Sequence, residues 1–86
     1  MSGPLDEIRG RITANDEAIV AAVNERLRLV AALWALKREI GADQLDPDRE
    51  RVLRTELAAA NAGPLSPGGL DRLMSELLAL TKSELA

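Results

Sequence analysis

A helical pattern runs without a break from about residue 4 to about residue 40. Its apolar residues recur at spacings of three, four and seven, and no proline interrupts them after Pro4. Proline suits the first helical position and Gly41 suits a helix end, so both ends of the helix are marked. The apolar stripe consists of Leu5, Ile8, Ile12, Ile19, Val23, Val30, Leu33 and Ile40.

The length of this helix decides the architecture. At ~1.5 Å per residue it spans ~55 Å, whereas a compact chain of 86 residues is roughly 30 Å across. The helix must therefore project from any globule that the other residues form. Since its apolar stripe continues to both ends, a second copy of the chain is the simplest partner to cover it. We predict an all-α homodimer in which the long helices are intertwined.

Two shorter helices complete the predicted fold. One begins at Asp46-Pro47, where aspartate caps and proline occupies the first turn, and extends to about Asn61. The other begins at Ser66-Pro67 and carries leucines along one side as far as Leu85. The segments GADQL and AGPLSPGG are the predicted loops. Residues 1–86 are expected to form a single domain.

The composition excludes several kinds of chemistry. The chain has no cysteine and no histidine, which removes disulfides, thiolate metal sites, and the commonest general base and metal ligand. The net charge of -3 and the lack of a basic run argue against nucleic acid as a partner. No apolar run is long enough to cross a bilayer, and the acidic N-terminus lacks a signal peptide's apolar segment. We expect a soluble, cytoplasmic protein without a membrane partner.

Two cations lie within the apolar stripe of the long helix. A helical projection places Arg26 and Lys37 near its centre, whereas Arg28 and Arg38 point away from it. One such residue is ordinarily explained by an aliphatic stem that lies on apolar surface while its charged tip reaches water. Two of them, ~16 Å apart along the axis, favour a cavity that receives an anion. Arg26 offers a planar fork matched to a carboxylate and Lys37 a compact charge, which suits a small dianion with a further oxygen to polarise.

Charged residues also gather where the second helix begins. Asp46, Asp48, Arg49 and Glu50 lie within one turn. Acidic residues at a helix N-terminus contribute ~0.3–1 kcal/mol each, and this capping role is sufficient to explain Asp46 and Asp48. The functional alternative is that Asp46 or Glu50 accepts a hydrogen bond from a ligand hydroxyl.

Together these residues resemble the all-helical (AroQ-type) class of chorismate mutases. In chain order the resemblance rests on LDEIRGRI, ND, ER eleven residues before Lys37, DPDRE and a final leucine-rich helix, which cover essentially the whole chain. Members of this class are three-helix chains that form intertwined dimers and convert chorismate to prephenate by a [3,3] rearrangement. The resemblance implies an isomerase of the shikimate pathway, in aromatic amino acid biosynthesis, without metal or cofactor. The group that carries it is Arg9, Asp16, Arg26, Lys37, Asp46, Arg49 and Glu50.

The resemblance also implies how the two substrate carboxylates are held. Arg26 would bind one of them, and Arg9 of the partner subunit would bind the other. The crossing follows independently from geometry, because Arg9 and Arg26 are seventeen residues apart, or ~25 Å along one helix. Asp16 would support the fold or orient an arginine.

The remaining roles concern the ether oxygen and the ring hydroxyl of the substrate. Lys37 would contact the ether oxygen and a nearby carboxylate. Asp46 and Glu50 would receive the ring hydroxyl, helped by backbone near Arg49. The expected catalytic residues are Arg26, Lys37 and Glu50, and the expected substrate-binding residues are Arg9, Arg26, Lys37, Asp46, Arg49, Glu50, Thr81 and Leu85.

The third helix is where the chain departs from the family pattern. Thr81 falls where the family usually has a serine that touches a carboxylate, and Leu85 falls where it usually has Gln or Glu to support the ether oxygen. Leucine has no hydrogen-bond donor, and Glu84 lies near the same face as a substitute if the helix end shifts. Ordinary core packing is the alternative explanation of both Thr81 and Leu85.

Other functions stay open at this point. One is a mutase for 4-amino-4-deoxychorismate in a secondary-metabolite pathway, since an ammonium in place of the ring hydroxyl would pair with Asp46 and Glu50. Another is a weakly active regulatory subunit that depends on a partner enzyme of the same pathway. A third is a helical interaction module without a ligand. Isochorismate pyruvate lyase shares the fold, but the intact DPDRE segment resembles the mutases more.

Overall fold

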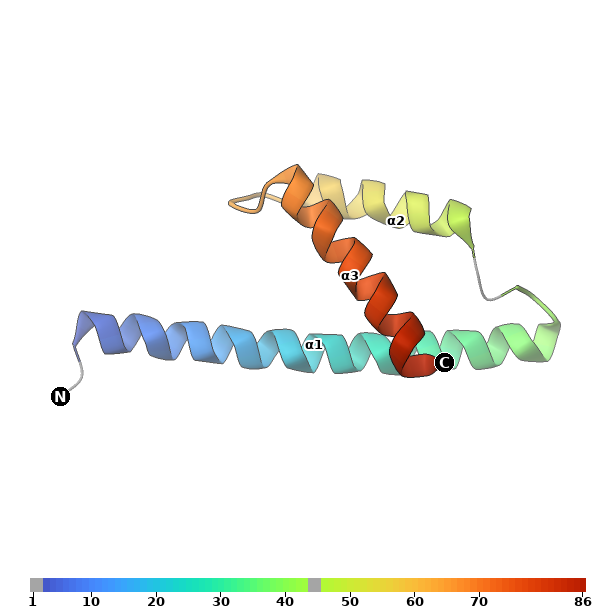
Figure 1. Ribbon diagram of the computed structural model, residues 1–86, viewed down its shortest axis with the longest axis horizontal. Coiled ribbons are helices and arrows are strands. Elements are labelled where there is room, and N and C mark those ends of the chain that lie inside the picture. Colours follow the sequence, from blue (N-terminus) through green and yellow to red (C-terminus); the bar gives the residue numbers. More distant parts are fainter. Residues whose placement is uncertain (1–2, 44–45) are drawn as a thin grey trace.

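The computed structural model describes residues 3–43 and 46–86, which form three helices (Figure 1). They are α1 (Pro4–Ile40), α2 (Pro47–Ala60) and α3 (Pro67–Leu85). The predicted all-α fold, with a long first helix and two shorter ones, is thereby confirmed. The predicted loop GADQL includes Gln44 and Leu45, which lie outside the described residues.

Helix α1 ends at the glycine that the sequence marks as its stop. Gly41 adopts the left-handed conformation with φ of 70°, which a residue with a Cβ atom rarely takes up. In this conformation the backbone N–H of Ala42 donates to the carbonyl of Lys37 at 2.8 Å, so one of the last free carbonyls of the helix is satisfied.

Side-chain caps begin the other two helices. Asp46 Oδ1 accepts a hydrogen bond from the backbone N–H of Arg49 at 3.0 Å. Ser66 Oγ accepts one from the N–H of Gly69, also at 3.0 Å. In both helices proline occupies the first turn, where its missing N–H has no cost. Each cap contributes ~1 kcal/mol to helix stability and fixes the residue at which its helix begins.

Helix α3 joins the other two. In Figure 1, α2 runs back in the direction opposite to α1, and α3 descends from the end of α2 to cross α1 beyond its middle. Within the described ranges, α3 packs against α1 and against α2, whereas α2 makes no packing contact with α1. The position of α3 therefore decides which face of α1 is covered.

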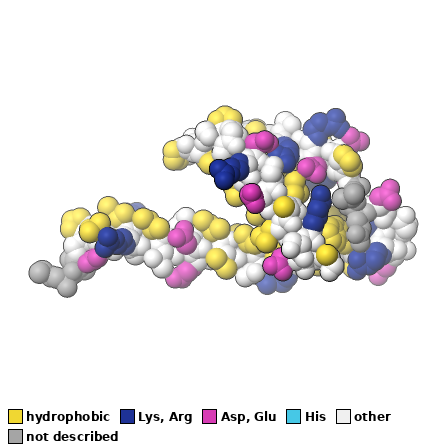
Figure 2. All heavy atoms as spheres, in the orientation of Figure 1, with side chains coloured by type: hydrophobic (Ala, Val, Ile, Leu, Met, Phe, Trp, Pro, Cys, Tyr) yellow, Lys and Arg dark blue, Asp and Glu magenta, His cyan; other side chains and the backbone are white. Residues whose placement is uncertain are grey.

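The N-terminal half of α1 projects beyond the packed region. Every residue from 4 to 22 is exposed, including Ile8 at 56%, Ile12 at 54% and Ile19 at 53%. Apolar side chains are visible along this projecting part in Figure 2. The long dimension of the chain is 59 Å, which agrees with the length predicted for the helix. Half of the predicted apolar stripe thus lies outside the fold of a single chain.

The accessible surface measures how open this shape is. A compact monomer of 9.2 kDa would expose about 4,900 Å², whereas this chain exposes 6899 Å². Its radius of gyration is 16.7 Å, against ~12 Å for a compact chain of this length. One chain therefore leaves roughly 2,000 Å² more surface exposed than a compact monomer does.

The core of a single chain is small. Met74, 3% exposed, and Thr81, 5% exposed, are the two buried residues in the described part of the chain, and both belong to α3. No helix within residues 3–43 and 46–86 combines the length and the apolar character needed to cross a membrane.

We expect Met74→Ala to lower the free energy of unfolding by ~2–5 kcal/mol, because it removes most of a buried side chain and leaves a cavity. Met74→Leu conserves most of the volume and is expected to cost less than ~1.5 kcal/mol. Urea unfolding followed by circular dichroism, at one protein concentration, measures both. Equal losses for the two variants would contradict a close-packed position for Met74.

Candidate active site

One face of α1 carries two half-buried positive charges. Six residues of α1 are half-buried, and apart from the adjacent pair Arg26 and Leu27 they follow one another at spacings of three and four, as one side of a helix requires. Two of the six are cations, whereas Arg28 and Arg38 are exposed. The predicted placement of Arg26 and Lys37 together on one face of α1, with Arg28 and Arg38 pointing away from it, is therefore confirmed. The half-buried residues are Val23, Arg26, Leu27, Val30, Trp34 and Lys37.

Arg26 is held in place by α3. Its Nη1 donates a hydrogen bond to Thr81 Oγ1 at 2.5 Å, and the same hydroxyl donates to the backbone carbonyl of Leu77 at 2.7 Å. Among the described residues, no carboxylate lies within ion-pair distance of the Arg26 guanidinium. Its charge is thus not neutralised by an acidic side chain of this part of the chain.

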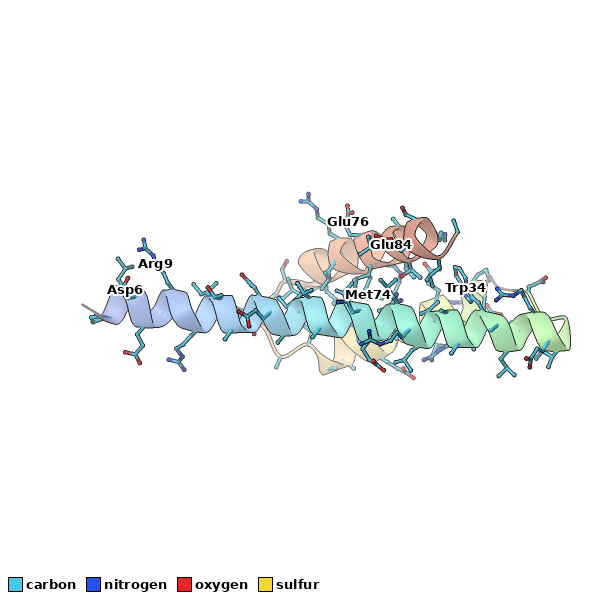
Figure 3. The ribbon with its side chains drawn as sticks, turned by 90° about the horizontal axis from the view of Figure 1, so that it is seen from below. Asp6, Arg9, Trp34, Met74, Glu76 and Glu84 are labelled. Atoms are coloured by element: carbon cyan, nitrogen blue, oxygen red, sulfur yellow. The ribbon has the colours of Figure 1, made fainter. Side chains whose placement is uncertain are left out.

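Lys37 lies in the last turn of α1, eleven residues beyond Arg26. This separation corresponds to ~16 Å along the helix axis, and both side chains are half-buried on the same face. Trp34, which is also half-buried, lies between them in the sequence. Both Trp34 and Met74 of α3 lie near the crossing of α1 with α3 (Figure 3). The two cations therefore flank a partly apolar surface.

The acidic start of α2 divides into a capping residue and a half-buried one. The capping role of Asp46 is confirmed by its hydrogen bond from the Arg49 backbone, while the Arg49 side chain is exposed and lies 3.7 Å from the carboxylate of Glu56. Asp48 pairs with Arg51. Glu50 is the half-buried member of this group, which makes it the best placed to face a ligand.

Arg54 is a functional candidate that the sequence analysis did not single out. Its guanidinium lies 3.6 Å from Glu50 Oε1, donates to Asp71 Oδ1 at 2.5 Å and donates to Ser75 Oγ at 3.3 Å. It thus links α2 to α3 and contacts the carboxylate of Glu50. The spacing of four residues from Glu50 to Arg54 could have predicted their ion pair from the sequence. No sequence pattern predicted the partners of Arg54 on α3.

The end of α3 places Leu85, and not Glu84, toward the interior. Leu85 is half-buried and Glu84 is exposed, with the helix regular as far as Leu85. Thr81, one turn earlier, is buried. The side of α3 that continues from Thr81 is therefore apolar at its end.

Among the described residues of one chain, the predicted site residues that come into contact across two helices are Arg26 and Thr81. Glu50 lies on α2, which makes no packing contact with α1 in the described ranges, and Arg9 lies apart from both.

Arg9 is exposed and lies on the projecting end of α1, with Asp6, far from α3 (Figure 3). Since α1 is one continuous helix from Pro4 to Ile40, Arg9 and Arg26 stay ~25 Å apart along its axis. Asp16 is exposed on the same projecting half.

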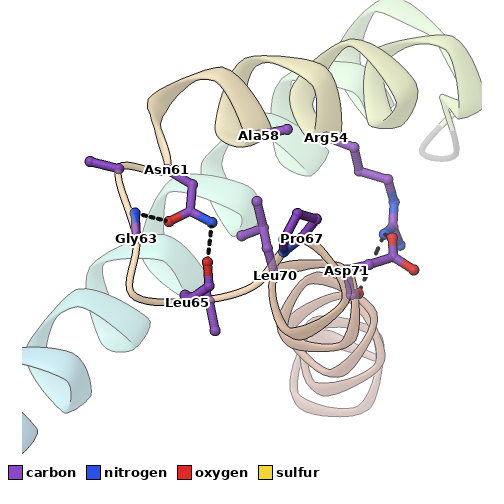
Figure 4. A pocket seen from close by; sticks show the side chains of 9 residues that line it. Arg54, Ala58, Asn61, Gly63, Leu65, Pro67, Leu70 and Asp71 are labelled. Carbon is purple, nitrogen blue, oxygen red and sulfur yellow. Dashed lines mark hydrogen bonds and ion pairs between the residues drawn. The ribbon is translucent and has the colours of Figure 1, made fainter.

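A hollow of about 360 Å³ lies elsewhere, between the end of α2 and the start of α3 (Figure 4). Its polar groups bond to one another: Asn61 Nδ2 donates to the carbonyl of Leu65 at 2.9 Å, and Asn61 Oδ1 accepts from the N–H of Gly63 at 3.0 Å. We interpret it as a feature of the turn, because no site residue predicted from the sequence lines it and the guanidinium of Arg54, which does, is bonded to Asp71 and Ser75. The lining residues are Arg54, Ala58, Asn61, Ala62, Gly63, Leu65, Pro67, Leu70 and Asp71.

The arrangement suits anion binding and electrostatic stabilisation. One face of α1 offers a half-buried guanidinium and ammonium, and the buried hydroxyl of Thr81 contacts the guanidinium, whereas the half-buried carboxylate of Glu50 lies on α2. Among the described residues, no group of three acidic, histidine or cysteine side chains is placed to hold a metal ion. A reaction that depends on orientation and on fixed positive charge can use this set of groups.

Comparison with known proteins agrees with this chemistry. The sequence model of the family described as chorismate mutase type II matches residues 8–84. The match covers most of α1, all of α2 and nearly all of α3, and it includes Arg9, Arg26, Lys37 and Thr81. Leu85 lies directly beyond it. No curated protein matches the chain.

Proposed function

Since the chain belongs to the chorismate mutase type II family, we propose that it is an isomerase that converts chorismate to prephenate. The observation that supports this most strongly is the position of Arg26 and Lys37, both half-buried on one face of α1. Chorismate carries two carboxylates and an ether oxygen, so it offers the negative groups that such a face would bind. The rearrangement breaks one C–O bond and forms one C–C bond within a single molecule.

The proposed active form is a homodimer. Each chain leaves roughly 2,000 Å² more surface exposed than a compact monomer, and two chains together would bury up to about 4,000 Å². This lies within the range of about 2,000–5,000 Å² that obligate homodimers bury. The exposed apolar stripe around Ile8, Ile12 and Ile19 is the surface that the second copy would cover.

In such a dimer the two substrate carboxylates would be held from two chains. Arg26 would bind one, and Arg9 of the partner subunit would bind the other. Fixing both ends of the substrate brings the enolpyruvyl arm over the ring in the compact pose that the reaction requires. Because the rearrangement takes place within one molecule, the gain comes from restricting the internal rotations of the substrate to a near-attack geometry.

Lys37 and Glu50 are the residues proposed to act on the transition state and on the ring. As the C–O bond breaks, negative charge grows on the ether oxygen, and the Lys37 ammonium would stabilise it. Glu50 would accept the hydrogen bond of the ring hydroxyl. Asp46 would assist, but one of its oxygens already caps α2, so Glu50 is the stronger candidate.

The direct test is incubation of the purified protein with chorismate and, separately, with 4-amino-4-deoxychorismate. We expect chorismate to be lost and prephenate to form, and chromatography measures both compounds. Conversion of the amino compound alone would instead support the secondary-metabolite alternative. If neither compound is consumed, with or without cell extract, the proposal is wrong, and the result favours an interaction module.

A partner-dependent mutase is a second candidate, favoured by Leu85. This half-buried leucine stands where the family usually supplies a polar side chain, so the isolated chain would lack one contact to the ether oxygen. The same chorismate assay, repeated with cell extract, separates the two candidates. High turnover by the isolated protein would discard the partner-dependent one.

We expect Leu85→Gln to raise kcat/KM for chorismate about tenfold. The added amide would donate a hydrogen bond where charge develops, worth ~1.4 kcal/mol. Leu85→Met, which keeps the side chain apolar and of similar volume, serves as the matched control and should leave kcat/KM nearly unchanged. Equal rates for the glutamine and methionine variants would show that position 85 does not face the substrate.

A further inference from the structure

We propose that Thr81 is a positioning residue: it fixes the guanidinium of Arg26 and does not serve as a hydrogen-bond donor to the substrate. This inference rests on the proposed function, in which Arg26 binds a carboxylate of the substrate. It differs from the role that the family resemblance implies, in which the residue at this position touches a substrate carboxylate. The hydrogen bonds of Thr81 carry the distinction.

The hydroxyl of Thr81 has its single proton already in use. A hydroxyl group provides one donor and two acceptor positions. The proton of Thr81 is directed to the backbone carbonyl of Leu77 at 2.7 Å, and the oxygen accepts from Arg26 Nη1 at 2.5 Å. A carboxylate accepts hydrogen bonds and cannot donate one, so it would meet a Thr81 oxygen that has no proton to offer.

The backbone of α3 also fixes where this oxygen lies. Threonine in a helix has restricted χ1 freedom, and its hydroxyl readily bonds to the carbonyl four residues earlier. With Thr81 only 5% exposed, its side chain has little space to change rotamer. The guanidinium of Arg26 is therefore bonded to an atom that is itself immobilised.

Arg26 keeps its other donors and its charge for a ligand. A guanidinium has five N–H donors, and one of them is directed to Thr81. Within residues 3–43 and 46–86, no carboxylate pairs with Arg26. A half-buried arginine held by a neutral hydroxyl is oriented without being neutralised, which is the state required to bind an incoming carboxylate.

The test compares Thr81→Val, which removes the hydroxyl at nearly constant volume, with Thr81→Ser, which keeps it. We expect Thr81→Val to lower kcat/KM for chorismate about tenfold, mainly by raising KM, because a loosened Arg26 weakens carboxylate binding in ground and transition states alike. Thr81→Ser should recover most of the lost activity. The matched control is Thr55→Val: Thr55 makes the same bond to the carbonyl four residues earlier, at 3.1 Å, but is exposed on α2.

A second readout follows Arg26 itself. In ¹⁵N-labelled protein, the Nε–Hε signal of Arg26 should show greater mobility in Thr81→Val than in the wild type or in Thr81→Ser. Lower kcat/KM without any change in this signal would mean that Thr81 contacts the substrate directly, and the proposal is then wrong. The proposal is also wrong if Arg26 becomes mobile in Thr81→Val while kcat/KM stays unchanged. It is equally wrong if neither kcat/KM nor the mobility of Arg26 changes.

The two readouts separate this inference from the proposed function. If the wild-type protein does not convert chorismate, the proposed function fails. The comparison of Arg26 mobility between wild type and Thr81→Val still decides whether Thr81 fixes the guanidinium. If chorismate is converted and Arg26 stays ordered in Thr81→Val, the positioning role alone fails.

Discussion

Replacing Lys37 with alanine is expected to lower the turnover of chorismate by about 10³-fold or more while the proposed dimer persists. Removing one preorganised donor to a developing oxyanion typically costs 10²–10³-fold in rate, or ~2.7–4 kcal/mol, and Lys37 would supply a full charge in a half-buried place. Steady-state kinetics measure the loss, and size-exclusion chromatography with light scattering measures the oligomeric state.

The chain provides its own control for this substitution. Lys82 is the other lysine of the sequence and is exposed on α3, so Lys82→Ala removes the same kind of group without touching the half-buried face of α1. Its turnover should match that of the wild type. Retained turnover in Lys37→Ala would contradict the assignment of Lys37. If the only effect of Lys37→Ala is a higher stability, the result would support an interaction module in which the half-buried charge of Lys37 destabilises the fold.

The helix boundaries could be predicted because local signals set them. Pro4 and Gly41 mark α1, and the caps Asp46 and Ser66, each followed by proline, mark the starts of α2 and α3. These signals act over three or four residues, so the sequence contains them in full. The long α1 also made the projecting shape predictable, since an uninterrupted helix has a fixed rise per residue.

The placement of Arg26 and Lys37 was predictable for a similar reason. Both fall on the stripe that includes Val23 and Val30, and the 100° turn per residue places them on one side of α1 whatever packs there. What packs there was not predictable. The hydrogen bond from Arg26 to Thr81 joins residues 55 positions apart, and it depends on where α3 crosses α1.

The ion pair and hydrogen bonds between α2 and α3 could not be predicted from the sequence for the same reason. Arg54 has one partner on its own helix, Glu50, and two on α3, Asp71 and Ser75. Helical spacing reveals the first but carries no information on the others, because their approach depends on the turn between the two helices. The choice between Glu84 and Leu85 was likewise decided by packing, which turns Leu85 inward and leaves Glu84 exposed.

Two inactive variants are expected to restore activity when they are mixed. In the proposed dimer each site combines Lys37 of one chain with Arg9 of the partner subunit. An Arg9→Ala chain paired with a Lys37→Ala chain therefore forms one site that lacks both groups and one site that is intact. Random pairing makes half of the dimers mixed, so unfolding and refolding the two together should restore about a quarter of the wild-type turnover. Chorismate consumption before and after co-refolding measures it.

A second mixture tests whether the recovery comes from a crossed site. Arg26 and Lys37 belong to the same chain in each proposed site, so mixing Arg26→Ala with Lys37→Ala leaves every site with one group missing. This mixture should stay inactive, although its chains exchange as freely as those of the first. Recovery in both mixtures would point to a site that the two chains share in some other way. Recovery in neither, with mixed dimers detected by mass spectrometry, would mean that Arg9 does not act from the partner subunit.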